Sequence, residues 1–338
     1  MISVSKLLRY IMILVLLLIS SSIIGCTAKN DNNDNNENIK YQVIDAKGTT
    51  VSFDRKPERI LTLSLSTDNI VLGLVKTDKL VAINKLADDK TCSNIVPLAK
   101  KVATKIKNPT AEEILAMDPD LVIVPDWGRI EIIDNLRELG VKVVVVKGAK
   151  NYSEIQETIQ IIAAALGEKE KGQKLIELMD NELLEITNRV KKIPENERKN
   201  IVLISVMTAY GGSGCSYDDA CKYAGVVNGI SASGIKNGQT LTKEMLVKIN
   251  PDILLMPIYS DHGNFDTNGF INSYLKDPSL QTINAIKNNN IVFPRDGYIY
   301  NASQDFVFGI REIARAAYGS EFDFPNNMHL SVSGENNN

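Results

Sequence analysis

Histidine and tryptophan are scarce in this sequence, whose 338 residues include two histidines and one tryptophan. So little histidine leaves little room for imidazole-based catalysis or for a bare metal site made of several imidazoles. Neither sign of charge dominates, with 38 lysines and arginines against 41 aspartates and glutamates, so the excess of positive charge that nucleic-acid binding needs is missing. There is only one long apolar run, which excludes several membrane spans. With 44% apolar residues, the chain is long enough for two globular cores.

The first 25 residues have the layout of an export signal. Lys6 and Arg9 precede an apolar stretch from 10 to 19, and small and apolar residues then lead to Cys26. The apolar stretch is about ten residues, shorter than the roughly 20 that a spanning helix needs. An uncleaved anchor that counts through Ile24 is the alternative. We predict that residues 1–25 are a signal peptide and no part of the fold.

Residues 23–26, Ile-Ile-Gly-Cys, resemble the bacterial lipoprotein box, in which the cysteine sulfur takes a diacylglycerol group and the cysteine becomes the first residue. The resemblance implies that Cys26 carries acyl chains such as palmitate and holds the protein on the outer face of the cytoplasmic membrane. Each acyl methylene adds about 0.8 kcal/mol of membrane affinity, so two or three chains suffice. The polar tract that follows cannot bury apolar surface, and we predict a tether at 26–40.

Three cysteines remain besides Cys26, namely Cys92, Cys215 and Cys221, so at most one internal disulfide forms. Cys215 and Cys221 are close in sequence, and pairing between them is left open. No two cysteines have the CxxC spacing of a thiolate metal site. Removal of residues 1–25 takes away two positive charges and no acid, so the net charge falls from −3 to −5. A mildly acidic exported body is expected.

An internal repeat is the most specific signal in the chain. Residues 110–125 read TAEEILAMDPDLVIVP, and residues 242–257 read TKEMLVKINPDILLMP. Each copy has a threonine suited to a helix N-cap, a short helix, a turn with proline, and a continuous apolar run of strand length. Continuous apolar strands are buried on both faces, which is typical of parallel sheets covered by helices. The repeat therefore predicts two α/β lobes of the same plan.

Strands and helices alternate on both sides of these copies. We expect further strands at 59–65, 141–146, 201–206 and 291–293, and helices at 67–74, 130–139, 151–166, 218–227, 269–274 and 303–318. Between the halves, apolar residues recur every three or four positions from 168 to 190, which predicts one helix of about 35 Å. The fold class is α/β, with two lobes, each a mainly parallel sheet flanked by helices, bridged by a single long helix. The predicted parts are an N-terminal lobe at 41–167, the linking helix at 168–192, a C-terminal lobe at 198–325 and a polar tail at 326–338.

The chain resembles, from about 56 to 318, the substrate-binding lipoproteins of ABC importers for ferric siderophores, haem and cobalamin. The residues that carry the resemblance are Lys-Pro-Glu-Arg-Ile at 56–60, Leu-Gly at 72–73, Asp-Pro-Asp-Leu-Val-Ile at 118–123 and Asn-Pro-Asp-Ile at 250–253. It implies two lobes joined by one long helix, a ligand in the cleft between them, and an ABC permease with its ATPase as partners. We expect a monomer that binds no nucleic acid.

The same resemblance implies that one glutamate at the start of a helix in each lobe docks onto the permease. Read through the repeat, these residues are Glu112 and Glu244. A carboxylate in the first helical turn is also favoured by the helix dipole without any partner. Glu113 illustrates that ordinary role, because Thr110-x-x-Glu113 is a capping box. Glu112 is not needed for that cap, and the second copy has Met245 where the first has Glu113.

The ligand is expected where loops after the carboxyl ends of the strands converge from both lobes. Aromatic rings with polar tips suit a large ligand that is partly apolar and partly rich in oxygen, and an arginine suits an anionic one. The single tryptophan directly follows a strand. The candidate ligand-binding residues are Ser66, Trp127, Arg129, Tyr210, Tyr259, Tyr298 and Tyr300.

The residues argue against catalysis and against a bound metal ion or cofactor. Residues 211–214, Gly-Gly-Ser-Gly, lack the Gly-Lys-Ser/Thr ending of a phosphate loop and are better explained as a turn. His262 and His329 are far apart in sequence, and His329 falls in the polar tail. A surface-anchored hydrolase on the same fold is the alternative of another class, with His262 as its only imidazole base inside the fold.

The metal enters as cargo, in a chelate. A ferric siderophore is our first expectation, cobalamin the second and haem the third, since few axial ligands for haem are present. A sensor lipoprotein that binds a ligand without transport is a further alternative, which would have no need of Glu112 and Glu244.

Overall fold

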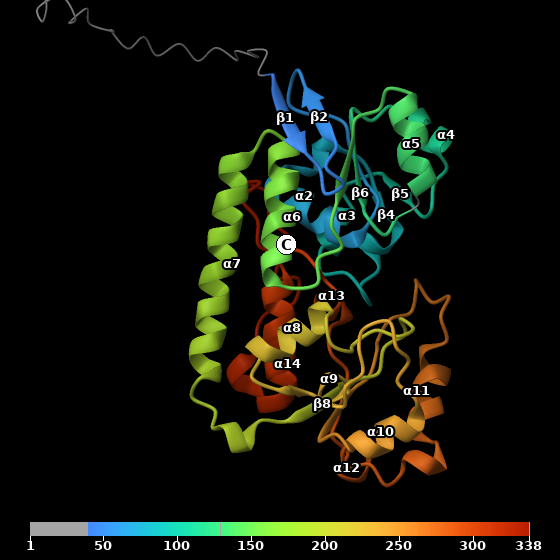
Figure 1. Cartoon of the computed structure of the whole chain (residues 1–338), viewed down its shortest axis with the longest axis vertical. Helices are drawn as coiled ribbons and strands as arrows, with labels where there is room; N and C mark the ends of the chain where they lie inside the picture. Colours follow the sequence, from blue (N-terminus) through green and yellow to red (C-terminus); the bar gives the residue numbers. More distant parts are fainter. Residues whose placement is uncertain (1–39, 129, 338) are drawn as a thin grey trace, which may run out of the picture. The chain divides into compact units, whose positions relative to one another are not determined.

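The computed structural model describes residues 40–128 and 130–337 (Figure 1). The predicted signal peptide, Cys26, most of the predicted tether and Arg129 lie outside the described residues. Among the residues that are described, no helix has both the length and the apolarity to cross a bilayer.

The first sheet has five parallel strands in the order β5-β4-β3-β6-β7. Both of its faces are covered, because Val122, Val124 and Val145 pack into one apolar cluster while Leu121, Ile123 and Val146 pack into another. This explains the continuous apolar runs of the sequence. Its strands are β3 (Ile60–Thr62), β4 (Leu80–Asn84), β5 (Thr104–Ile106), β6 (Leu121–Pro125) and β7 (Val143–Val146).

Helices surround this sheet on both faces, and an antiparallel hairpin precedes it. The helices are α2 (Leu65–Leu74), α3 (Val96–Ala99), α4 (Ala111–Ala116), α5 (Ile130–Glu138) and α6 (Tyr152–Ala165), with short 3₁₀ turns η1 (Thr77–Lys79) and η2 (Lys85–Asp88). The hairpin consists of β1 (Tyr41–Ile44) and β2 (Thr50–Phe53), and its Tyr41 ring stacks on Phe53. Neither the hairpin nor strands β4 and β5 were among the predicted elements.

The second sheet has four parallel strands in the order β11-β10-β8-β9. They are β8 (Asn200–Leu203), β9 (Val227–Asn228), β10 (Ile253–Leu255) and β11 (Ile291–Val292). The helices of this half are α8 (Ser216–Tyr223), α9 (Gly229–Ala232), α10 (Lys243–Ile249), α11 (Thr267–Leu275), α12 (Asn284–Lys287), α13 (Asp296–Ile299) and α14 (Phe306–Tyr318), with 3₁₀ turns η3 (Glu195–Glu197), η4 (Pro278–Leu280) and η5 (Ser320–Phe322).

A helix of 22 residues, α7 (Lys169–Val190), joins the two halves. Leu175, Met179 and Ile186 on its inner face are buried, and the helix packs against α6 and α2 of the first half and α8 and α14 of the second. The predicted fold class is therefore confirmed: two parallel sheets covered by helices and bridged by one long helix. The exact lobe boundaries remain predictions. One apolar cluster runs through the α7 side of both halves, so the two cores are not separate there.

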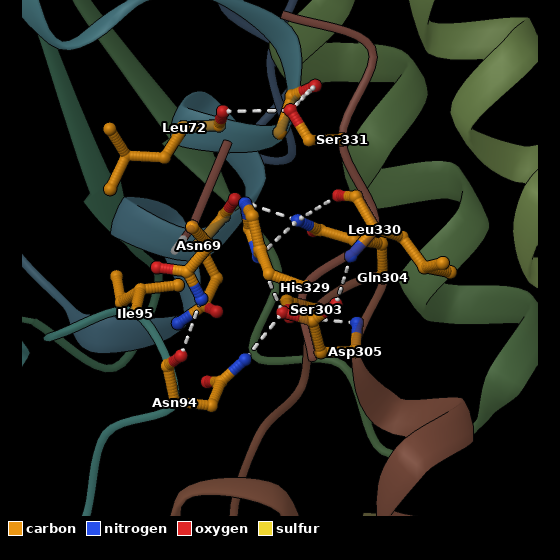
Figure 2. Close-up of polar contacts among 12 residues, drawn as sticks. Asn69, Leu72, Asn94, Ile95, Ser303, Gln304, Asp305, His329, Leu330 and Ser331 are labelled. Carbon is orange, nitrogen blue, oxygen red and sulfur yellow. Dashed lines mark hydrogen bonds and ion pairs between the residues drawn. The ribbon is translucent and has the colours of Figure 1, made fainter. Parts of the chain in front are cut away.

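The last described residues return to the first half (Figure 2). The Val332 amide donates to the Gly73 carbonyl at 2.8 Å, and Glu335 accepts from the Thr77 amide at 2.7 Å. His329, assigned from sequence to a polar tail, has a fully buried side chain whose Nδ1 lies 2.6 Å from Asp305 Oδ2. This segment therefore ties residues that follow the second sheet to helix α2.

Candidate functional site

Loops that follow strands of both sheets enclose a cavity of about 340 Å³. Its walls come from the start of α2, from the residues after β6 and β7, and from the segments around Tyr210 and Tyr300 in the second half. Since the carboxyl ends of parallel strands are where α/β sheets bind ligands, this is the expected position. The lining residues that bear on ligand binding are Ser64, Ser66, Trp127, Lys147, Lys150, Met207, Tyr210, Cys215, Ser216 and Tyr300.

Trp127 lies between this cavity and a second one of about 360 Å³, because its side chain lines both. The residue is 69% exposed, which is unusual because tryptophan is highly buried on average in folded proteins. Gly148 makes room for the ring, since a Cβ atom there would lie 2.7 Å from Trp127 Cδ1. The second cavity is also lined by Leu86, Lys107 and Tyr259.

Two tyrosines form one wall of the first cavity. The rings of Tyr210 and Tyr300 have centroids 5.3 Å apart and are tilted by 42°. The Tyr210 hydroxyl is 3.0 Å from Ser216 Oγ, and the Tyr300 hydroxyl donates to Ser205 Oγ at 3.1 Å. Burial raises the pKa of both phenols above the ordinary value, so they stay neutral hydrogen-bonding groups near pH 7.

The charged residues that line the two cavities are all lysines. Lys147 and Lys150 line the first cavity and Lys107 lines the second, whereas none of the described lining residues is an aspartate or glutamate. Two of these lysines pair with carboxylates that line neither cavity. Lys147 donates to Glu154 Oε1 at 2.7 Å, which raises the pKa of the lysine, and Lys107 Nζ lies 3.2 Å from Asp261 Oδ2. Lysines on the walls favour an anionic ligand, and the two pairs reduce the charge that they present.

The structure brings together five of the seven residues predicted for ligand binding. Ser66, Trp127, Tyr210 and Tyr300 line the first cavity and Tyr259 lines the second. Their contact with a ligand remains a prediction.

Tyr298 and Arg129 are different. Tyr298 is 2% exposed, packs edge-on against Phe308, and donates its hydroxyl to the Met328 carbonyl at 3.2 Å. It lines neither cavity, because the chain after β11 forms helix α13 there and turns this side chain into the core. Its position therefore gives no support to the prediction of ligand contact. Arg129 lies outside the described residues.

Sequence reasoning missed the lysines and the thiol of the site. Lys147 and Lys150 directly follow strand β7, so the rule that singled out Trp127 after β6 would have found them. Cys215 lines the first cavity as a free thiol, and Cys221 is also free and buried. Burial raises the pKa of both thiols, so they are weak nucleophiles.

The two glutamates predicted to dock are exposed at matching helix starts. The Thr110 hydroxyl accepts from the Glu113 amide at 3.2 Å, and Glu113 Oε2 accepts from the Thr110 amide at 2.8 Å, which completes the predicted capping box. In the second copy Thr242 caps the Met245 amide at 3.3 Å. Neither cap needs Glu112 or Glu244. Hydrogen bonding at each helix start lowers the pKa of both carboxyls, so both are ionised at neutral pH.

His262, the candidate base of the hydrolase alternative, lines neither of the two cavities. His262 Nε2 is 2.8 Å from Asp88 Oδ1, at a contact between the two halves. Among the described residues, no three histidine, cysteine, aspartate or glutamate side chains are grouped as metal ligands. What the site offers chemically is stacking, hydroxyl groups and ammonium groups around a hollow, an arrangement suited to holding a molecule.

Several known proteins are similar to this chain over most of its length. The chain is 24% identical over 320 residues to the uncharacterized ABC transporter substrate-binding lipoprotein YvrC of Bacillus subtilis, covering 91% of this chain and 96% of the relative. It is 21% identical to the molybdate-binding protein MolA of Haemophilus influenzae, over 84% and 88% of the two chains. The periplasmic heme-binding protein RhuT of Roseiflexus sp. RS-1 superposes with a TM-score of 0.66 at 21% identity, over 77% of this chain and 98% of that structure, which shows a shared fold.

A family described as periplasmic binding protein matches residues 60–296. This stretch begins at strand β3 and extends to the residue that starts α13, so it contains both parallel sheets, helix α7 and most residues that line the two cavities, although Tyr300 follows it. Because the match covers well over half of the sequence, the chain belongs to the periplasmic binding protein family.

Proposed function

We propose that this protein is an extracytoplasmic solute-binding lipoprotein that captures a ferric siderophore in the cleft between its halves and delivers it to an ABC permease. The observation that carries this proposal is the composition of the cleft wall. Aromatic rings and hydroxyls from both halves meet there with lysines, while the described lining residues include no carboxylate. Family membership supports a binding role rather than a catalytic one.

The charge of the wall favours an anionic complex over a neutral one. A ferric ion held by three catecholates carries three negative charges, and its aromatic rings match Trp127, Tyr210 and Tyr300. Lys147 and Lys150 in the first cavity, and Lys107 in the second, would face that charge. One relative, 20% identical over 268 residues, is the petrobactin-binding protein YclQ of Bacillus subtilis.

Haem and cobalamin remain the alternatives within the same type of importer. Met207, which is 52% exposed and lines the first cavity, is the side chain best suited to ligate a haem iron without giving up a hydrogen bond. Cobalamin carries a single negative charge on its phosphodiester, so it would form fewer ion pairs with the three lysines. The relation to MolA adds molybdate, an oxyanion, to the ligands worth testing.

The proposal includes the cytoplasmic membrane and an ABC permease as partners. Lipidation of Cys26 would hold the protein at the outer face of the cytoplasmic membrane as a monomer. Glu112 and Glu244, exposed at equivalent helix starts of the two halves, would then meet basic residues of the permease whose ATPase drives import. The hydrolase alternative receives no support, because its candidate base, His262, lines neither cavity.

Thermal unfolding of the mature protein with a panel of ligands tests the proposal. The panel is a ferric hydroxamate, a ferric catecholate, haemin, cyanocobalamin and molybdate. A ligand present at 100 times its Kd stabilises the folded protein by about 2.7 kcal/mol, which raises Tm by several degrees. We expect the ferric catecholate to give the largest shift.

A charge variant and a matched control sharpen this test. Lys147→Gln with Lys150→Gln should weaken binding of the ferric catecholate about tenfold, since two cations leave the wall. Lys191→Gln with Lys192→Gln, just past the C-terminal end of α7, changes net charge equally and should have no effect. A Tm shift with cyanocobalamin or haemin alone would show that this ligand, and not a siderophore, is the cargo. The absence of a Tm shift with every member of the panel would overturn the proposed function as a binding protein for such ligands.

A further inference from the structure

One loop of the second half reaches across to the first half beside the second cavity. It spans residues 258–264, after β10, and it meets the segment that follows η2. The Ser260 amide donates to Thr91 Oγ1 at 3.1 Å, and the His262 amide donates to Asp89 Oδ2 at 2.7 Å. Each of these hydrogen bonds joins residues about 170 positions apart, so the loop contributes a contact between halves that helix α7 does not make.

The side chain of His262 strengthens this contact. Its Nε2 lies 2.8 Å from Asp88 Oδ1, and its Nδ1 lies 3.7 Å from Asp89 Oδ2 and 3.8 Å from Asp261 Oδ1. Three carboxylates within 4 Å surround one imidazole, with 30% of its side chain exposed. The ring therefore adds a side-chain contact with Asp88 to the two backbone hydrogen bonds that hold the loop.

The other ionisable groups around the loop are accounted for. Lys107 pairs with Asp261 at 3.2 Å, which offsets one of the three carboxylates. Burial opposes ionisation of Asp89, but hydrogen bonds from Thr91 and from the His262 amide prevail and hold its pKa below the ordinary value. Burial, aided by the nearby aspartates, raises the pKa of the Cys92 thiol, so it stays neutral.

The same loop carries Tyr259 into the second cavity. On the side of its own half, Asp296 Oδ2 accepts from the Ile258 and Tyr259 amides at 2.9 Å each. On the far side, Asp89 holds the His262 amide, three residues further along. Asp261 and His262 both have positive φ values, 45° and 56°, so the chain turns tightly between the two supports. Tyr259 is therefore positioned by contacts with both halves.

We propose that His262 is a positioning residue of the binding cleft, whose ring contact with Asp88 holds the 258–264 loop onto the first half and so keeps Tyr259 against the ligand. This inference rests on the proposed function, because it concerns release from the same cleft. When the contact between His262 and Asp88 is removed, the loop opens more often and the ligand leaves faster.

Hydrogen exchange of the mature protein without ligand tests this contact directly. The amides of residues 258–264 should exchange about three- to tenfold faster in His262→Ala than in the unmodified protein, while the rest of the chain keeps its protection. His262→Gln keeps an N–H donor for Asp88 and should restore most of the protection of the loop. Asp277→Asn removes a carboxylate that pairs with Lys243 at 2.5 Å within one half, and this control should behave as the unmodified protein does.

Dissociation of the ferric catecholate provides the second readout. Its rate should be about three- to tenfold higher in His262→Ala than in the unmodified protein, and should stay close to the unmodified rate in His262→Gln and in Asp277→Asn. Equal dissociation rates in His262→Ala and the unmodified protein would overturn the positioning role. Equal loop protection of these two proteins without ligand would also overturn it. A protected loop in a protein that binds no member of the panel would instead count against the proposed function.

Discussion

The two copies of the repeat solve the same structural problem with different means. In each copy a short helix ends, the chain takes a positive φ at Asp118 (48°) or Asn250 (44°), and a proline precedes a buried strand. The aspartate after the proline then ties the new strand to its neighbour. Asp120 accepts from the Glu58 and Arg59 amides at 2.9 Å, and Asp252 accepts from the Asn200 amide at 2.9 Å.

The copies differ at the helix start, and the difference distinguishes a carboxylate that caps the helix from carboxylates that do not. In the first copy Glu113 completes the cap, whereas in the second its place is taken by Met245, which is 41% exposed. Glu112 and Glu244 are exposed in both copies and are used by neither cap. A carboxylate that is retained at the same place in two differently capped helices is available for an external partner.

The largest expected effect comes from removing that carboxylate in both copies. Glu112→Ala with Glu244→Ala should abolish uptake of the ligand by cells, since both of the proposed contacts with the permease would be lost. Ligand affinity of the purified protein should be unchanged, because neither residue lines a cavity. Each single variant should transport at an intermediate rate. Glu113→Ala is the control, and unimpaired uptake by the double variant would favour a sensor over an importer.

Each half contains a buried carboxyl with a raised pKa, so the effect of the two groups on stability can be compared as the pH changes. Burial is the main cause that raises the pKa of Asp68 in the first half to about 8 and that of Asp296 in the second to about 7. When the pKa of a carboxyl is higher in the folded state, the group contributes its full stabilisation at pH values below its pKa in the unfolded state. This contribution is lost as the pH rises through its pKa in the folded state. Asp68→Asn should therefore raise Tm by several degrees at pH 8.5 and much less at pH 4.5.

Asp296→Asn should show the same trend, levelling off about one pH unit lower than Asp68→Asn. The control is Asp134→Asn, at an exposed position of α5. Calorimetric scans from pH 4.5 to 9 measure all three variants. A Tm difference between Asp68→Asn and the unmodified protein that stays constant over this range would show that Asp68 is ionised throughout.

The aspartates that tie the strands give a smaller effect that depends on the copy. Asp120→Ala leaves the Glu58 and Arg59 amides without their acceptor, whereas Asp252→Ala affects the Asn200 amide alone. At about 1 kcal/mol for each hydrogen bond to a partly exposed amide, Asp120→Ala should cost about 2 kcal/mol and Asp252→Ala about 1 kcal/mol. Urea unfolding measures both, and a larger cost at Asp252 would contradict the comparison.

The helix caps provide the smallest difference. Thr110→Ala should cost about 1 kcal/mol of stability, because it removes one bond of a capping box, and Thr242→Ala should cost somewhat less because its cap has a single bond. Serine at either position retains the hydroxyl and should restore most of the stability in the same urea measurement. Equal losses at the two sites would mean that the return bond from Glu113 adds nothing.

Local sequence was sufficient for most of the fold. The continuous apolar runs 121–125 and 253–255 predicted buried parallel strands because their residues pack on both faces, and the period of three to four at 168–190 predicted α7. The hairpin of β1 and β2 was missed because its strands are four residues each and one of its outward residues, Ile44, is apolar and 66% exposed. That exposure blurs the alternation by which a half-buried strand is recognised.

Long-range contacts explain what sequence could not supply. The segment after 326 is rich in polar residues without periodicity, yet Asn94 donates to Asp305 Oδ2 at 2.7 Å and to the Met328 carbonyl at 3.0 Å, and so joins three distant stretches of chain (Figure 2). Tyr298 is held in the core by the same segment. Nothing in the local pattern around Tyr298 distinguishes it from Tyr300, which lines the cavity two residues later.

The position of Trp127 has a practical consequence. Because it is the sole indole in the sequence and borders both cavities, all tryptophan fluorescence of the protein originates at the place where cargo would arrive. Ferric and haem complexes absorb in the near-ultraviolet and would quench that emission by energy transfer. Affinity and release can thus be followed on the unlabelled molecule, with no dye to disturb the cleft.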